Sequence, residues 1–212
     1  MDSLAAQVMH NQLFARIYQR AWRPVFTRLF SLGGTATTDF DDALRAYLTR
    51  PGPRLVLDVA CGPGNLTGPI GAGLSGSGRV IGLDHSASML ATAVATNATA
   101  RTQYVRGDAH ALPFPENTFD EAICLAALYL VPDPLPVLDE MVRVLHPGGQ
   151  IVVFTSATGP ITSLPGVRTV ASLAGYRVFD HDEITDRLRA AGAVGIEQTV
   201  IGEGQYVLAV KP

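Results

Sequence analysis

Short apolar runs rich in β-branched residues alternate along this chain with longer segments in which hydrophobic residues recur every three or four positions. This alternation predicts an α/β fold, in which parallel strands form a sheet and helices cover both faces. The runs interpreted as strands are Leu55–Asp58, Arg79–Asp84, Thr102–Arg106, Glu121–Leu125, Gln150–Thr155, Gly195–Ile201 and Gln205–Val210. Helices are expected at Gly64–Gly73, Ala87–Asn97, Leu135–Leu145 and from Asp180 to about Ala191.

Two local signals shape the C-terminal part. Asp180 and Glu183 have the spacing of a capping box, in which the Asp180 side chain accepts from the Glu183 N–H, and Gly192 is placed to stop that helix. Gly202–Gly204 is typical of a hairpin turn, so the last two strands are expected to be antiparallel.

The candidate chemistry lies where the first three strands end. Leu55–Asp58 ends in an acid and leads into Gly62 and Gly64, and such glycines let the backbone approach a ligand closely. The second strand ends in Asp84, at a position where an Asp can bind two ribose hydroxyls. A third acid, Asp108, follows the third strand. The pattern predicts a nucleoside-binding site at the carboxyl edge of the sheet.

This ordered series of acids around a Gly-x-Gly turn resembles the class I S-adenosylmethionine-dependent methyltransferases, and most closely those that methylate small metabolites. The resemblance runs from Leu55 to Phe154 and more loosely to Val210. It implies a Rossmann-like, doubly wound, seven-stranded and mostly parallel sheet with a C-terminal antiparallel hairpin strand, and S-adenosyl-L-methionine as cofactor. The expected reaction is methyl transfer to a small, partly apolar metabolite, with oxygen favoured over carbon or nitrogen as acceptor.

The resemblance also implies roles for individual residues. Asp58 and the loop after it would hold the methionine end of the cofactor, Asp84 would bind the ribose hydroxyls, and Asp108 would accept from the adenine amino group. The full set of implied cofactor contacts is Asp58, Ala60, Cys61, Gly62, Gly64, Asp84, His85, Met89, Asp108, Ala109 and Leu125.

Two other functions stay open on the sequence. A nicotinamide-dinucleotide oxidoreductase also has a Gly-rich turn and a strand-end acid, but Thr67 stands where its fingerprint has a small residue. The Asp58 carboxylate would also repel a pyrophosphate. A non-catalytic cofactor-binding partner protein fits the same residues, because the acceptor site cannot be verified from sequence.

Composition limits the domain organisation, the partners and the location that can be expected for the protein. The chain has 212 residues, of which 47% are hydrophobic, and is expected to form a single methyltransferase domain. Its net charge of −3, with no block of Lys or Arg, argues against nucleic acid as a partner. Neither a signal peptide nor a spanning apolar run is recognisable, so a cytoplasmic location is expected. Cysteine and histidine spacings predict no metal site, and the two cysteines are expected to be reduced.

Four parts of the domain are expected: an N-terminal helical arm or lid (1–50), the cofactor-binding core (51–155), a short substrate-side insertion (156–180), and the last helix with the terminal strands (181–212). Within the arm, Leu4–Leu32 is an amphipathic segment with interleaved arginines. We interpret it as a lid, with peripheral contact to a membrane as the alternative. In the insertion, apolar residues from Ile161 to Leu173 are expected to line a wall of the substrate pocket.

No catalytic base is identified. Methyl transfer from a sulfonium requires mainly alignment of donor and acceptor, although a hydroxyl acceptor benefits from a base within hydrogen-bond reach. The candidates for that role are Tyr18, Tyr129 and His181, with Tyr176 in addition.

Overall fold

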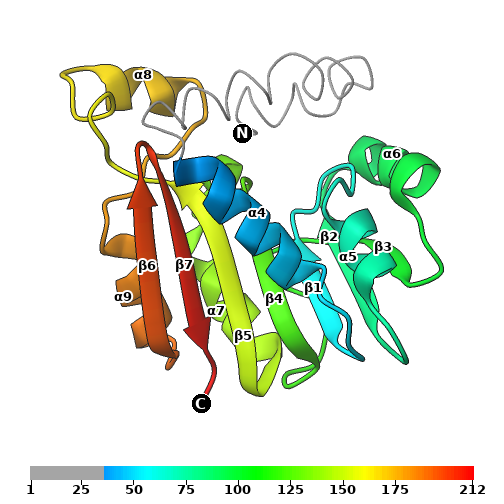
Figure 1. Cartoon of the computed structure of the whole chain (residues 1–212). Helices are drawn as coiled ribbons and strands as arrows, with labels where there is room; N and C mark the ends of the chain where they lie inside the picture. The colour runs from blue at the N-terminus through cyan, green and yellow to red at the C-terminus, as the bar shows by residue number, and fades with distance from the viewer. Residues whose placement is uncertain (1–35) are drawn as a thin grey trace.

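The computed structural model describes residues 36–212 and contains a seven-stranded sheet in the order β3-β2-β1-β4-β5-β7-β6 (Figure 1). Six strands are mutually parallel and β7 is antiparallel to its neighbours, which confirms the predicted fold class. The strands are β1 (Leu55–Val59), β2 (Arg79–Asp84), β3 (Thr102–Arg106), β4 (Phe119–Leu125), β5 (Leu145–Ser156), β6 (Val194–Ile201) and β7 (Gly204–Val210). The helices are α4 (Ala36–Leu48), α5 (Thr67–Gly73), α6 (Ala87–Asn97), the 3-10 helix η2 (Leu128–Leu130), α7 (Leu135–Val144), α8 (Val167–Leu173) and α9 (Glu183–Ala190).

Helices cover both faces of the sheet, with α4 and α5 on the near side in Figure 1 and α7 and α9 behind. Successive side chains of a strand point to opposite faces, so β1 contributes to two cores. Leu57 and Val59 pack in the core that includes α7 and α9, whereas Val56 packs in the core that includes α4 and α5. By the same alternation, Asp58 lies on the α5 side of the sheet.

The loop between β1 and α5 is longer than the sequence predicted. The expected helix began at Gly64, but α5 begins at Thr67. Gly64 has a φ of +76°, which lies in the left-handed region and cannot continue into a right-handed helix. Residues 60–66 are therefore free of helix and form a loop at the carboxyl edge of the sheet.

The predicted capping box before α9 is wrong. Asp182 occupies the N-cap position of this helix without a side-chain cap, and it is the backbone carbonyl of Asp180 that accepts from the Glu183 N–H. The Asp180 carboxylate accepts instead from Arg168 Nη1 at 2.7 Å and from Thr158 Oγ1 at 2.9 Å. A guanidinium competes well for a carboxylate, because the resulting hydrogen bond is charge-assisted.

The C-terminal hairpin is confirmed, since Ile201 pairs with Gly204 across a turn at Gly202 and Glu203. The Glu203 side chain turns inward and is only 5% exposed. It accepts from the backbone N–H of Ile161 at 2.7 Å and from Thr162 Oγ1 at 2.6 Å. The hairpin tip thereby fixes the segment that follows β5.

The segment around α8 stands apart from the core in Figure 1. Its apolar side chains do not pack inward: Leu164, Val170 and Leu173 are 56%, 67% and 81% exposed. Whether they border a substrate stays a prediction, and the arm over Leu4–Leu32, with Tyr18, lies outside the described residues. No helix within residues 36–212 is both long and apolar enough to cross a membrane.

Candidate functional site

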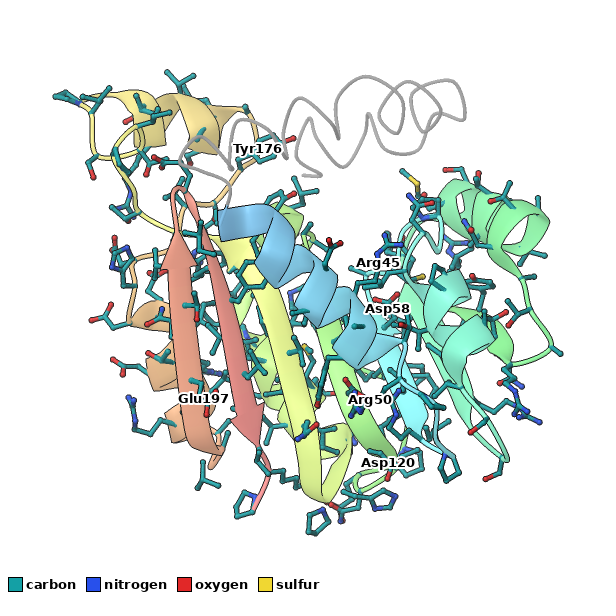
Figure 2. All side chains as sticks on the ribbon, in the orientation of Figure 1. Arg45, Arg50, Asp58, Asp120, Tyr176 and Glu197 are labelled. Carbon is teal, nitrogen blue, oxygen red and sulfur yellow. The ribbon has the colours of Figure 1, made fainter. Side chains whose placement is uncertain are left out.

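The ends of β1 and β2 bring two acids to the loop of residues 60–66. Asp58 is 4% exposed and accepts from Thr67 Oγ1, in the first turn of α5, at 2.6 Å. Figure 2 shows Asp58 near α5, with Asp120 at the opposite edge of the sheet. Asp84, at the end of β2, binds the same loop through the N–H of Gly62.

Burial governs the protonation of Asp58. Loss of hydration raises the pKa of this carboxyl to about 7, the Thr67 hydrogen bond opposes that rise, and the nearby Asp84 charge adds to it. Within residues 42–212, no Lys, Arg or His forms an ion pair with Asp58. A buried carboxylate in this state favours a ligand that carries positive charge.

Asp84 joins the loop to α6. Its Oδ2 accepts from the Gly62 N–H and its Oδ1 from the Ser86 N–H, each at 2.8 Å. Burial raises the pKa of Asp84 despite these hydrogen bonds. Each carboxylate oxygen can accept about two hydrogen bonds, so both oxygens retain capacity for hydroxyl donors. The geometry suits a pair of vicinal hydroxyls.

The two glycines of the loop differ in their surroundings. Gly62 has a φ of +55°, and a Cβ built on it meets no atom of residues 36–212 within 4 Å. Gly64 has a φ of +76°, and its Cβ would lie 2.4 Å from the Tyr104 hydroxyl oxygen. Close packing therefore accounts for Gly64, whereas at Gly62 the positive φ alone favours glycine.

Residues from β3 and α6 support the loop from beneath. The Tyr104 hydroxyl donates to the Asn97 carbonyl at 2.9 Å, and Asn97 Nδ2 donates to the Pro63 carbonyl at 2.7 Å. The loop itself holds a residue in an unfavourable conformation, because Ala60 has a φ of 56°. Such strain persists only where surrounding contacts fix the backbone.

The third acid lies beyond β3 and contacts a histidine. Asp108 Oδ1 accepts from the backbone N–H of His110 at 2.9 Å and pairs with His110 Nδ1 at 2.8 Å. The hydrogen bonds from His110 hold the pKa of Asp108 below its usual value. On its other side, His110 Nε2 lies 2.8 Å from the Pro132 carbonyl oxygen and 3.1 Å from that of Asp133. His110 thus bridges the loops that follow β3 and β4.

The remaining predicted cofactor residues come from the strands, loops and helix that follow one another around the same edge of the sheet. The Cys61 N–H donates to the Leu83 carbonyl at 3.0 Å, which joins the loop to β2. His85 follows β2 and is exposed, whereas Met89 in α6 is buried. Ala109 packs at the border of the larger core, and Leu125 ends β4.

The catalytic candidates do not converge in one place. Tyr129 lies in η2 after β4, is 5% exposed, and stacks on Tyr176 with ring centroids 5.7 Å apart. His181 is an exposed residue before α9, and its Nε2 lies 2.6 Å from the Thr158 carbonyl oxygen. Neither arrangement identifies a base, and Tyr18 lies outside the described residues.

Four site residues were missed by the sequence reasoning. Ser86 caps α6 through the Met89 N–H, Thr67 contacts Asp58, Tyr104 supports Gly64, and His110 binds Asp108. Only two had a local signal: Ser86 as an N-cap before a helical run, and His110 as a titratable residue two positions after a strand-end acid.

Comparisons with known proteins find similarity to methyltransferases. A family model described as "Methyltransferase domain" matches residues 57–153. The demethylmenaquinone methyltransferase of Bacillus licheniformis is 42% identical over 112 residues, which are 52% of this chain and 48% of that protein. The protein of the same name from Lysinibacillus sphaericus is 36% identical over 129 residues, covering 60% and 53% of the two chains. The chain thus spans about half the length of the curated relatives it matches.

A solved structure shares the fold. Haemonchus contortus phosphoethanolamine N-methyltransferase 2 superimposes with a TM-score of 0.74 over 97% of this chain and 59% of that chain, at 17% sequence identity. That identity supports similarity of fold alone. The family match identifies a methyltransferase domain over residues 57–153, from β1 to β5, and the shared fold agrees with it.

Proposed function

We propose that this chain transfers a methyl group from S-adenosylmethionine to a small, partly apolar metabolite. The observation that carries the proposal is the buried Asp58 carboxylate beside Asp84 and the exposed side of Gly62. When bound, S-adenosylmethionine supplies a methyl group on a positively charged sulfur, together with an ammonium, two ribose hydroxyls and an adenine amino group. These are donors and cations, which match three acids and an open glycine.

The chain's residues divide the recognition among them. Asp58, with the backbone of Ala60–Gly64, would hold the methionine ammonium and carboxylate. Asp84 would accept from both ribose hydroxyls while its bonds to Gly62 and Ser86 keep it in place. Asp108 would accept from the adenine amino group. His85, Met89, Ala109 and Leu125 would border the same ligand.

Catalysis in this proposal rests on alignment rather than on a protein nucleophile, because the leaving group is already activated. Tyr129 lies in η2, after β4, and its ring stacks on that of Tyr176. In this proposal the two rings would form an aromatic wall where the acceptor binds. Tyr129 would orient the acceptor from this wall. The N-terminal arm would complete the same single domain, with residues 156–180 on the substrate side.

The acceptor class follows from two observations. The relatives in Bacillus and Lysinibacillus are named for methylation of demethylmenaquinone, an acceptor that their name identifies as a quinone. The exposed apolar side chains around α8 suit a substrate with an apolar part. We therefore propose a ring compound with an apolar substituent as the acceptor, and we keep oxygen as the acceptor atom on the family resemblance of the sequence alone.

Calorimetric titration of the purified protein with S-adenosylmethionine and S-adenosylhomocysteine tests the first half of the proposal. Micromolar binding is expected for both, and no heat for a nicotinamide dinucleotide. Transfer of labelled methyl to reduced naphthoquinones and catechols, with products separated as O-, C- and N-methyl species, then tests the second half. Cofactor binding without turnover on any acceptor would favour a non-catalytic partner protein, and dinucleotide binding would contradict the proposal.

A pH dependence follows from Asp58. Because its pKa in the free protein is about 7, a ligand ammonium must displace a proton below that pH. Affinity for S-adenosylhomocysteine is expected to fall as pH decreases from 7 to 5, by at most about tenfold per unit. The stability of the free protein should change in the opposite direction. The pKa of Asp58 is higher in the folded than in the unfolded protein, so the free energy of unfolding should fall as pH rises from about 4 to 7. Calorimetry measures the pH dependence of affinity, and urea unfolding measures that of stability. If Asp58→Asn shows the same two pH dependences as the wild type, Asp58 is not the titrating group.

A further inference from the structure

His110 occupies a bridging position that the methyl-transfer proposal does not use. Its ring lies between the loop that follows β3, which carries Asp108, and residues 131–134, which connect η2 to α7. Asp133 in that connection has a φ of 44°, an unfavourable value for a residue with a side chain. A specific contact from His110 helps to explain why the backbone is held there.

Both ring nitrogens of His110 face acceptors. Nδ1 lies 2.8 Å from a carboxylate oxygen of Asp108, and Nε2 lies 2.8 Å from the Pro132 carbonyl oxygen. A neutral imidazole has one N–H and one lone pair, so it satisfies one side and places a lone pair against an acceptor on the other. Only the imidazolium donates to both loops at once.

The charges around the ring agree with that protonation state. Burial favours the neutral ring, but the hydrogen bonds to Asp108 and to the two carbonyls outweigh it and raise the pKa of His110. On the opposite loop, the groups that face the ring are the backbone carbonyl oxygens of Pro132 and Asp133. A carboxylate on one side and two carbonyl oxygens on the other therefore face the His110 ring.

We propose that His110 is a positioning residue that, as an imidazolium, orients Asp108 for the adenine amino group and ties this end of the site to the loop carrying Tyr129. The inference rests on the proposed function. Both bonds from His110 end on Asp108 Oδ1, so Oδ2 is the oxygen directed to the ligand. Adenine recognition then weakens as pH rises and the proton is lost.

The test compares S-adenosylhomocysteine affinity between pH 6 and 9 in the wild type, in His110→Gln, and in His146→Gln as a control. His146 is an exposed histidine near the start of β5, at the opposite edge of the sheet. At pH 6 the His110→Gln protein should bind about 3- to 10-fold more weakly than the wild type, the range for partly exposed charged hydrogen bonds. By pH 9 the two affinities should converge, and His146→Gln should follow the wild type throughout.

Taking the ratio of affinities at each pH removes the titration of Asp58 and of the ligand, which all three proteins share. A ratio that does not change with pH would overturn the inference. NMR titration of the ring nitrogens supplies an independent readout: the raised pKa of His110 should fall in Asp108→Asn, and a His110 pKa that this change leaves unaffected also overturns the inference. Absence of S-adenosylhomocysteine binding by the wild type at every pH would instead remove the proposed function, and the adenine role of His110 with it.

Discussion

Replacing Asp84 with Asn should lower the affinity for S-adenosylhomocysteine about 100-fold. The carboxylate accepts from the N–H groups of Gly62 and Ser86, one on each oxygen, and in our proposal also from both ribose hydroxyls. An amide has a single acceptor oxygen, so its NH2 group must face one of those two N–H donors. Loss of about 3 kcal/mol, the sum for two charge-assisted hydrogen bonds at the lower end of their range, corresponds to the expected change.

Asp120→Asn is the matched control for this variant. Asp120 also uses a carboxylate oxygen to accept a backbone N–H, that of Leu55 at 2.8 Å, but it lies at the opposite edge of the sheet (Figure 2). Calorimetry should show wild-type affinity in Asp120→Asn and the loss in Asp84→Asn. Wild-type affinity in Asp84→Asn would refute the ribose assignment, and equal losses in both variants would attribute the effect to the sheet as a whole.

The strands and the acids at their ends could be predicted because their signals are local. An apolar run bounded by polar residues specifies a buried strand, and the strand end specifies which edge of a parallel sheet the next residue occupies. The bounds of β2 and β3 agree with the prediction residue for residue, and β1 extends one residue further, to Val59. Asp58 and Asp84 meet for this reason alone, since β1 and β2 are parallel neighbours.

What failed depended on partners distant in sequence. Asp180 has the spacing of a capping residue, but its carboxylate accepts a hydrogen bond from Arg168 instead. The residues next to Asp180 in the sequence give no sign of that contact. Tyr104 follows the strand pattern of β3, yet its place beneath Gly64 depends on the order of β1, β2 and β3 in the sheet. His110 was only one of the histidines whose spacing predicts no metal site, whereas the contacts of its ring depend on the loop after β4.

Gly62→Ala and Gly64→Ala should separate the two reasons for a glycine in this loop. Both residues have positive φ, so each alanine is expected to cost about 1–2 kcal/mol of folding free energy. At Gly64 the new methyl group also meets the Tyr104 ring, with the hydroxyl oxygen at 2.4 Å, and overpacking adds about 1–3 kcal/mol. Urea unfolding should therefore rank Gly64→Ala as the less stable variant, at about 2–5 kcal/mol below the wild type.

Affinity should rank the two variants in the opposite order. The Gly62 methyl group projects to the side where no atom of the described part of the chain lies within 4 Å, which is the side proposed for the ligand. The folded Gly62→Ala protein should therefore bind S-adenosylhomocysteine at least about tenfold more weakly. The Gly64 methyl group points toward Tyr104 instead, and the second change Tyr104→Leu should restore part of its stability by removing the ring. If Gly64→Ala is the less stable variant and Gly62→Ala the weaker binder, Gly62 is needed for the ligand and Gly64 for internal packing. Neither variant alone can separate these two reasons. If both measurements rank the variants alike, the loop acts as one packed unit and Gly62 does not mark the ligand side.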